Sequence, residues 1–312
     1  MSAFLAALLP VIIVVMAGRF LAWREIIPPE GWRAIERLAY VLLFPALIIR
    51  ALARAPFETA PWKLALTLII AQLVLGGIGL LAKRFIVSRP SVGVIIQSNV
   101  RWNTFVALSL GSALFGEEGL ALVTIAAAAM IPTANILSVT ALTTFGDVGD
   151  GKKRHPVAEL VRNPLIIACV VGGVIAASGL TLPVLVDDTL DLMGRATIAL
   201  GLLAAGAGVD VSALKRAGPR TLVWSLVRLL GLPLAVIGVS LAIGLDGIGF
   251  AIAVLCASVP TATNSYILAR QLGGDAPLAA NLIAVQTVLA ALTMPAIWFA
   301  CLALGLFGDL PQ

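Results

Sequence analysis

The chain has 312 residues, of which 60% are apolar and only 12% are charged, and its formal net charge is +5. Ordinary soluble domains are about 45–50% apolar and about 25% charged, so the chain lacks the polar residues that a soluble enzyme needs to cover its surface. Its basic residues fall in short loops and form no stripe suited to nucleic acid. The composition therefore predicts a membrane protein that contacts lipid and binds no nucleic acid.

Ten apolar stretches bounded by Pro, Gly and charged residues follow along the chain. A helix needs about 20 apolar residues to cross the bilayer, so ten spans use most of the length and leave no separate soluble domain. We expect an all-α polytopic membrane protein with ten transmembrane helices. The predicted spans cover residues 3–22, 38–54, 61–82, 91–115, 119–145, 164–180, 192–209, 220–244, 247–270 and 277–305.

The loops that follow odd-numbered spans hold most of the 21 lysines and arginines. Cytoplasmic loops of membrane proteins attract this excess of positive charge. The pattern predicts a multi-pass protein with both termini on the non-cytoplasmic side. It also places the short connection between the two halves of the chain in the cytoplasm.

Prolines near span starts recur at a nearly constant offset. Pro10 and Pro164 are 154 residues apart, and Pro61 and Pro219 are 158 apart. Five spans per half would bring the second half into the membrane from the opposite side, and such inverted repeats are typical of secondary transporters. A duplication retained only for packing is the alternative. We expect one transporter domain over residues 1–312, with repeat one at 1–145, a cytoplasmic linker at 146–163 and repeat two at 164–312.

Span 4 carries a polar segment that contains Arg101, Asn103 and Thr104. An arginine within the membrane costs about 2.5–3.5 kcal/mol on insertion scales, so it needs an anion, carbonyl groups or water. A guanidinium binds a carboxylate through two parallel hydrogen bonds, which favours a site for an acidic substrate. The alternative is an arginine that reaches to the cytoplasmic interface.

Span 9 carries a second polar segment, in which Pro260 is followed by Thr261, Thr263 and Asn264. Proline removes a backbone donor and breaks the helix, and the positive end of the half-helix that follows favours an anion. A kink with a purely structural role is the alternative. Asn135 in span 5 could line the same cavity or join helices by hydrogen bonds.

Acidic residues are absent from the middle of every predicted span, so a proton relay through a buried carboxylate is not indicated and the coupling ion stays open. The cysteines Cys169, Cys256 and Cys301 lie in separate apolar runs, and His155 is the only histidine. Neither a metal site nor a cofactor is expected.

The chain resembles the auxin efflux carrier family of bacterial transporters, and the resemblance covers essentially its whole length. Its most specific segments are Arg101-Trp102-Asn103-Thr104, Pro132-Thr133-Ala134-Asn135, Pro260-Thr261-Ala262-Thr263 and Gly273-Gly274-Asp275.

The resemblance implies that helices 4 and 9 are broken and cross near the midplane. It implies that helices 1, 2, 6 and 7 form a scaffold, that the other helices move as an elevator, and that the scaffold supports a homodimer. It also implies a place in the bacterial inner membrane. Related bacterial carriers are associated with malate and malonate, and the plant PIN-type relatives with auxin. Asn103 matches the asparagine that contacts the substrate carboxylate in the plant carriers, whereas Trp102 replaces their helix-breaking proline.

Two other classes of function remain open. Asp187, Asp188 and Asp191 have the spacing with which prenyl-transfer enzymes hold Mg²⁺ through diphosphate, although a second acidic cluster of that spacing is absent. A channel-like protein is the other alternative. We expect instead a non-enzymatic carrier of a small organic anion. Its predicted substrate-binding residues are Arg101, Asn103, Thr104, Asn135, Pro260, Thr261, Thr263 and Asn264.

Overall fold

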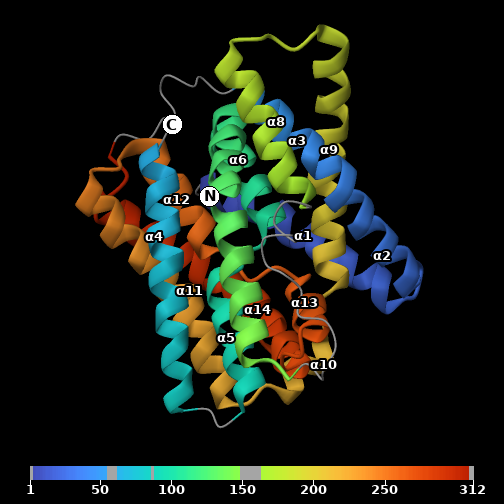
Figure 1. Cartoon of the computed structure of the whole chain (residues 1–312), viewed down its shortest axis with the longest axis vertical. Coiled ribbons are helices and arrows are strands. Elements are labelled where there is room, and N and C mark those ends of the chain that lie inside the picture. The colour runs from blue at the N-terminus through green and yellow to red at the C-terminus, as the bar shows by residue number, and fades with distance from the viewer. Residues whose placement is uncertain (1–2, 55–61, 86–87, 148–162, 309–312) are drawn as a thin grey trace. The chain divides into compact units, whose positions relative to one another are not determined.

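The computed structural model describes residues 3–54, 62–85, 88–147 and 163–308 (Figure 1). All regular secondary structure in these residues is helical, and they contain no strand. Most of the predicted linker 146–163 lies outside the described residues. The all-α prediction is confirmed for the described part.

Every predicted span coincides with helical residues. Span 2 covers the last residue of one helix and two short helical segments that follow it, and spans 4 and 9 are interrupted within the predicted range. In chain order the helices are α1 (Ala3–Trp23), α2 (Pro29–Leu38), the π-helix η1 (Ala39–Leu43), α3 (Phe44–Arg54), α4 (Trp62–Gly79), the 3-10 helix η3 (Leu80–Arg84), α5 (Arg89–Val100), α6 (Thr104–Phe145), α8 (Pro164–Ser178), α9 (Val184–Ala207), α10 (Val211–Arg216), α11 (Pro219–Ile243), α12 (Gly247–Ser258), α13 (Ser265–Gln271) and α14 (Ala276–Ala303).

Local sequence signals explain where several helices start. Pro164 and Pro219 occupy first helical positions, where the missing N–H costs nothing and the fixed φ suits the helix. The side chain of Asn163 accepts a hydrogen bond from the backbone N–H of Leu165 at 2.9 Å and so caps α8. These starts fall within one residue of the predicted ones.

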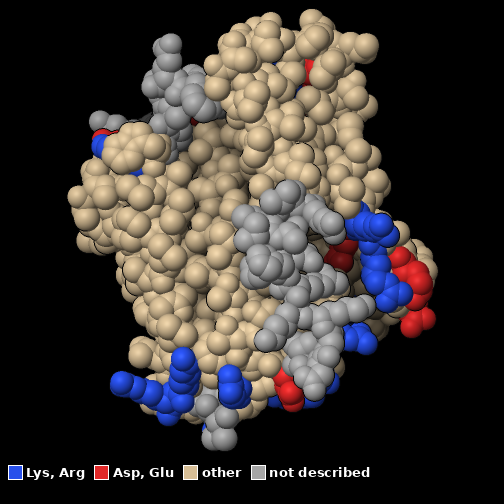
Figure 2. Space-filling model, in the orientation of Figure 1, with Lys and Arg blue, Asp and Glu red and all other residues tan. Residues whose placement is uncertain are grey.

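Six helical segments are long and apolar enough to cross a membrane, and one of them combines α5 and α6. Figure 2 shows a wide uncharged surface, with the charged side chains gathered toward parts of its margin. The protein is a multi-pass membrane protein. The count of ten crossings and the inverted repeat stay predictions. The six segments are Ala3–Trp23, Trp62–Arg84, Arg89–Phe145, Val184–Ala207, Pro219–Ile243 and Ala276–Ala303.

The chain forms two compact units. Unit 1 holds the helices of predicted spans 1, 2, 6 and 7, which the family resemblance assigns to a scaffold, together with part of α6. Unit 2 holds the remaining helices, the rest of α6 and both breaks, while the part of span 4 after its break belongs to unit 1. Unit 1 comprises Met1–Trp62, Phe105–Ala128 and Val161–Gly208, and unit 2 comprises Lys63–Thr104, Ala129–Leu160 and Val209–Gln312.

Close helix packing in unit 1 depends on glycine. A Cβ added to Gly18 of α1 would overlap the carbonyl oxygen of Leu203 in α9, and one added to Gly206 of α9 would overlap the carbonyl oxygen of Val15 in α1. Small residues let helix backbones approach closely in a bilayer, where dispersion contacts drive association. The α1–α9 contact is therefore specified by glycines on both helices.

Unit 2 is built around a different core. Buried apolar residues of α5, α6, α11, α13 and α14 form one cluster, which includes Ile95, Leu142, Trp224, Ala269 and Leu282. Because α5 contributes to this cluster on several of its faces, it is buried along almost its whole length. A helix so enclosed by protein can end within the membrane without exposing its last carbonyl groups to lipid.

Both interruptions predicted in spans 4 and 9 are present. Helix α5 ends at Val100 and α6 begins at Thr104, while α12 ends at Ser258 and α13 begins at Ser265. Arg101 adopts an extended backbone with φ −81° and ψ 151°, so the first break forms with Trp102 in the place of the proline of the plant carriers. Gly116, at φ 59° and ψ −141°, divides α6 between predicted spans 4 and 5.

A candidate substrate site at two helix breaks

The two breaks are joined by direct hydrogen bonds within unit 2. The backbone N–H of Asn103 donates to the carbonyl oxygen of Pro260 at 2.8 Å. The hydroxyl of Thr261 donates to the carbonyl oxygen of Ser98 at 2.8 Å. Segments about 160 positions apart in the sequence therefore meet, as the resemblance implied for the breaks in helices 4 and 9.

Thr261 and Ser98 also share a buried polar network with Gln286 of α14. The Gln286 side-chain oxygen accepts from the backbone N–H of Thr261 at 3.1 Å, and its amide nitrogen donates to the Ser98 hydroxyl at 2.7 Å. All three side chains are at most 4% exposed. Since buried polar groups must be paired, this network holds the second break at a fixed position against α5.

Arg101 connects three of the predicted substrate-binding residues. Its guanidinium donates to the side-chain oxygen of Asn264 at 2.9 Å and to the side-chain oxygen of Asn135. Both acceptors are neutral amide oxygens, so these two contacts orient the guanidinium of Arg101. Arg101 is half-buried and Asn264 is exposed, which places this group where a small anion can approach it.

Asn103 and Thr104 lie at the beginning of α6 and are 6% and 9% exposed. The first turn of a helix presents N–H groups without intrahelical partners, and the partial positive charge there favours an anion. Thr263 is half-buried within the second break. The structure thus gathers Arg101, Asn103, Asn135, Pro260, Thr261 and Asn264 through the contacts described above.

Trp102 lies between two of the predicted residues and is 3% exposed. Its indole N–H has no hydrogen-bond partner within the described part of the chain. An indole nitrogen only donates, and a buried donor without an acceptor costs about 1–3 kcal/mol. The first break therefore presents a donor to which an acceptor atom of a ligand could bind.

Arg228 of α11 also contacts the two breaks, although it is not among the predicted substrate-binding residues, because a single arginine in an apolar span is more often interfacial or paired structurally. It is fully buried. Its Nη1 donates to the carbonyl oxygen of Ala257 at 2.7 Å, and its Nη2 and Nε donate to that of Arg101 at 3.2 and 3.4 Å. Gln72 of α4 similarly donates to the carbonyl oxygen of Val100 at 2.8 Å. The signal available in the sequence was a strongly polar side chain within an apolar run.

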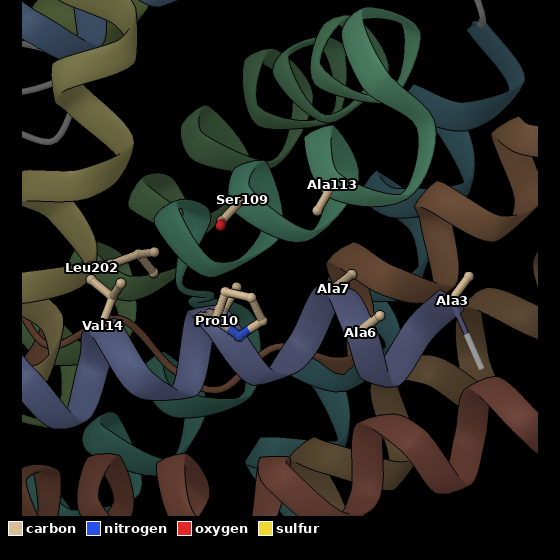
Figure 3. Close-up of a pocket in the computed structure, with 9 residues that line it drawn as sticks. Ala3, Ala6, Ala7, Pro10, Val14, Ser109, Ala113 and Leu202 are labelled. Carbon is tan, nitrogen blue, oxygen red and sulfur yellow. The ribbon is translucent and has the colours of Figure 1, made fainter. Parts of the chain in front are cut away.

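A pocket of about 390 Å³ lies in unit 1, against α1 (Figure 3). Its only polar side chain is Ser109 of α6, and no predicted substrate-binding residue lines it. A site without charge or convergent donors is not suited to a carboxylate. The lining consists of Ala3, Ala6, Ala7, Pro10, Val11, Val14, Ser109, Ala113 and Leu202.

The acidic motif at the start of α9 contacts arginines. Asp187 is paired with Arg50 at 3.2 Å and with Arg54 at 2.6 Å, and Asp191 is paired with Arg50 at 2.8 Å. Asp188 is exposed. Two of the three carboxylates therefore have arginine partners inside unit 1, which does not favour the alternative in which they hold Mg²⁺ for a prenyl-transfer reaction.

The chain is similar to a family of known proteins and to several curated relatives. Residues 153–298 match the model of a family described as membrane transport protein. An uncharacterized transporter of Methanothermobacter thermautotrophicus is 23% identical, over 92% of this chain and 95% of the relative. The uncharacterized transporter YfdV of Escherichia coli K12 is 22% identical, over 90% of this chain and 93% of the relative. These matches confirm the predicted resemblance.

Proposed function

We propose that this membrane transporter of the auxin efflux carrier family is a secondary carrier of small organic anions, and not an enzyme. The substrates we propose are mono- or dicarboxylates such as malate and malonate, or auxin-like acids. One observation carries the proposal: the Asn103–Pro260 hydrogen bond joins two helix breaks beside the guanidinium of Arg101. A positively charged side chain and the positive end of a helix at one place favour a carboxylate.

In this proposal the carboxylate binds at the start of α6. Asn103 and Thr104 donate hydrogen bonds to it, and Pro260 keeps the second break open against them. Arg101 adds positive potential to the approach, and its bonds to Asn135 and Asn264 orient the guanidinium. The walls of the site are supplied by Asn135, Thr261, Thr263 and Asn264.

We propose that transport occurs by elevator-type alternating access. Unit 2 contains both breaks and would carry the substrate, while unit 1 would serve as the scaffold and, in a homodimer, as the contact between subunits. The continuous glycine-packed helices of unit 1 and the separate core of unit 2 support this division. We place the carrier in the bacterial inner membrane with both termini on the non-cytoplasmic side, following the distribution of basic residues.

Counterflow in proteoliposomes tests the proposal. Vesicles loaded with unlabelled malonate, malate or indole-3-acetate are diluted into the labelled acid, with and without a pH gradient. We expect saturable exchange of at least one acid, because a carrier reorients with substrate bound. Asn103→Ala should abolish this exchange, whereas Thr140→Ala, a change at an exposed position of the same helix, should preserve it.

The outcomes separate the alternatives. Flux that does not saturate and shows no counterflow would indicate a channel. Exchange that is unchanged in Asn103→Ala would show that the substrate binds elsewhere than at the two helix breaks. Consumption of an isoprenoid diphosphate in the presence of Mg²⁺ would support the enzyme instead.

A further inference from the structure

Arg228 is a fully buried cation in the middle of α11, and all its hydrogen bonds go to backbone carbonyl oxygens. None of the ion pairs in the described part of the chain includes it. A buried charge is normally paired with an opposite charge, because leaving water costs several kcal/mol. The carbonyl groups around Arg228 must therefore supply its compensation.

Those carbonyl groups belong to the ends of two half-helices. The oxygen of Ala257 lies in the last turn of α12, and that of Arg101 directly follows α5. The C-terminal end of a helix carries about half an elementary negative charge, so the two ends together carry about one. Arg228 carries one positive charge and lies within 3.4 Å of both. The three charges approximately cancel.

We propose that Arg228 is a positioning residue that sets the charge selectivity of the substrate site. This inference deepens the proposed function and rests on it. By neutralising the negative ends of α5 and α12, Arg228 lets the positive start of α6 and the guanidinium of Arg101 determine which charge the site accepts. Without Arg228 the same crossing would present about one negative charge close to the substrate, in a low-dielectric region where charges interact strongly, and an anion would be repelled.

Trp102 provides an independent indication that an acceptor atom binds here. Its buried indole N–H, without a partner in the described residues, immediately precedes Asn103 and the start of α6. A carboxylate oxygen would satisfy this donor, and so would a carbonyl oxygen of a neutral amide. The indole N–H alone therefore does not distinguish a charged ligand from a neutral one. The electrostatic potential at the site, which depends on Arg228, does distinguish them.

Two substitutions separate the charge of Arg228 from its hydrogen-bonding geometry. Arg228→Lys keeps the charge and loses the planar fork, while Arg228→Gln keeps a donor for one carbonyl and loses the charge. Arg220→Gln, at an exposed position of the same helix, is the matched control. Each protein is tested by malonate counterflow, with malonamide as the neutral competitor of similar size.

We expect Arg228→Gln to raise the KM for malonate at least tenfold. The inhibition constant of malonamide should stay within about threefold of its value in wild type. Arg228→Lys should stay within about threefold of wild type for both compounds, and Arg220→Gln should match wild type. Equal losses in the Lys and Gln variants, or an unchanged KM in Arg228→Gln, would overturn the inference. A purely structural role would weaken malonate and malonamide together.

A second pair of variants keeps the test decisive if Arg228→Gln does not fold. Ser225 lies one helical turn before Arg228, is fully buried, and its hydroxyl has no partner among the described residues. Ser225→Asp would pair with Arg228 and neutralise it in place, whereas Ser225→Asn has nearly the same shape without charge. The inference requires a tenfold higher KM for malonate in the Asp variant than in the Asn variant, and equal values would contradict it.

Thermal shift of the purified protein distinguishes failure of this inference from failure of the proposed function. If wild type exchanges none of the three acids, the proposed substrates are wrong. Stabilisation of wild type by acetate and malonate but not by their amides, lost in Arg228→Gln and retained in Arg228→Lys, would still support the inference. Equal effects of anions and amides on wild type would overturn it.

Discussion

The two units of the molecule use their arginines in opposite ways. In unit 1, Arg50 and Arg54 contact the carboxylate of Asp187, so positive and negative charges cancel side chain to side chain. In unit 2, Arg101 and Arg228 donate to amide and carbonyl oxygens of neutral groups. Ion pairs hold together the helices of unit 1, whereas in unit 2 the arginines hold the ends of broken helices through amide and carbonyl oxygens. The two units therefore stabilise their helices by different kinds of polar contact.

The two units also differ in the continuity of their helices. In unit 1, α1 and α9 are continuous and approach each other through glycines. In unit 2, α5 and α12 end inside the chain's apolar interior, where side chains satisfy their last carbonyl groups. Continuous helices satisfy their own backbone, but broken helices need polar partners. Polar groups therefore gather at the breaks.

The largest effect is expected from breaking the close packing of unit 1. Gly206→Leu places a side chain where the carbonyl oxygen of Val15 lies. Overpacking typically costs about 1–3 kcal/mol and more where nothing can move aside, and here the obstacle is backbone, so the cost falls beyond the upper end of that range. We expect the variant to lose its monodisperse peak in size-exclusion chromatography. Gly173→Leu is the control, because a Cβ there meets no atom within 4 Å. A folded Gly206→Leu protein with an unchanged melting temperature would contradict the glycine-packed scaffold.

The next largest effect is expected from the ion pairs of unit 1. Asp187→Asn leaves the mostly buried guanidinium of Arg50 with a weaker set of partners, and breaking a buried pair typically costs about 3–5 kcal/mol. We expect a marked fall in melting temperature, measured in detergent. Asp188→Asn, at an exposed neighbouring position, should change it little. Equal melting temperatures for the two variants would show that these pairs do not stabilise unit 1.

A smaller effect is expected from removing one donor in unit 2. Trp102→Phe keeps the aromatic ring and deletes the indole N–H, and loss of one hydrogen bond worth about 1 kcal/mol should raise the KM for the transported acid about fivefold. Trp32→Phe is a matched control in unit 1, because its buried indole N–H also has no partner among the described residues. A KM that is the same in both variants would show that the indole N–H of Trp102 does not bind the substrate.

The smallest effect is expected outside the spans, at the N-cap of α10. Asp210 accepts hydrogen bonds from the hydroxyl and the N–H of Ser212, and chiefly that hydroxyl lowers the pKa of Asp210 below its ordinary value. A carboxylate with a lowered pKa in the folded state stabilises the protein above its unfolded pKa of about 4, and this stabilisation is lost as the pH falls through the folded pKa. Because the side chain is 45% exposed, the cap contributes at most about 1 kcal/mol.

The measurement for this cap is the difference in melting temperature between wild type and Asp210→Asn. We expect wild type to be slightly more stable at neutral pH, and the difference to disappear in acid below the ordinary pKa of aspartate. A difference that is constant with pH would assign the effect to shape and not to charge.

The interruption in span 9 could be predicted from a local cause, because Pro260 cannot continue a helix. The interruption in span 4 was expected only from the resemblance to the auxin efflux carrier family, since this chain has Trp102 where the plant carriers have proline. The partners of Arg101 could not be predicted. Asn264 and Asn135 are distant in sequence and also compatible with helix packing elsewhere, and only the fold brings their oxygens to one guanidinium.

Arg228 illustrates the same limit more strongly. In the sequence it is one basic residue in an apolar run, equally suited to the interface or the interior. Its role depends on where α5 and α12 end relative to α11, which no local pattern specifies. The acidic motif of Asp187 is the reverse case, since its spacing suggested metal binding but its contacts are with arginines.

The sequence by itself determined that this protein is an all-α membrane protein, where several of its helices begin, and that one of its spans breaks at Pro260. Hydropathy, capping residues and prolines act over a few residues, so they can be read along the chain. Only the tertiary structure decided which polar groups meet at the breaks and which charges are neutralised by acids or by carbonyls. Those outcomes depend on distances of a few ångströms between segments far apart in sequence, because hydrogen bonds and ion pairs form only at such range.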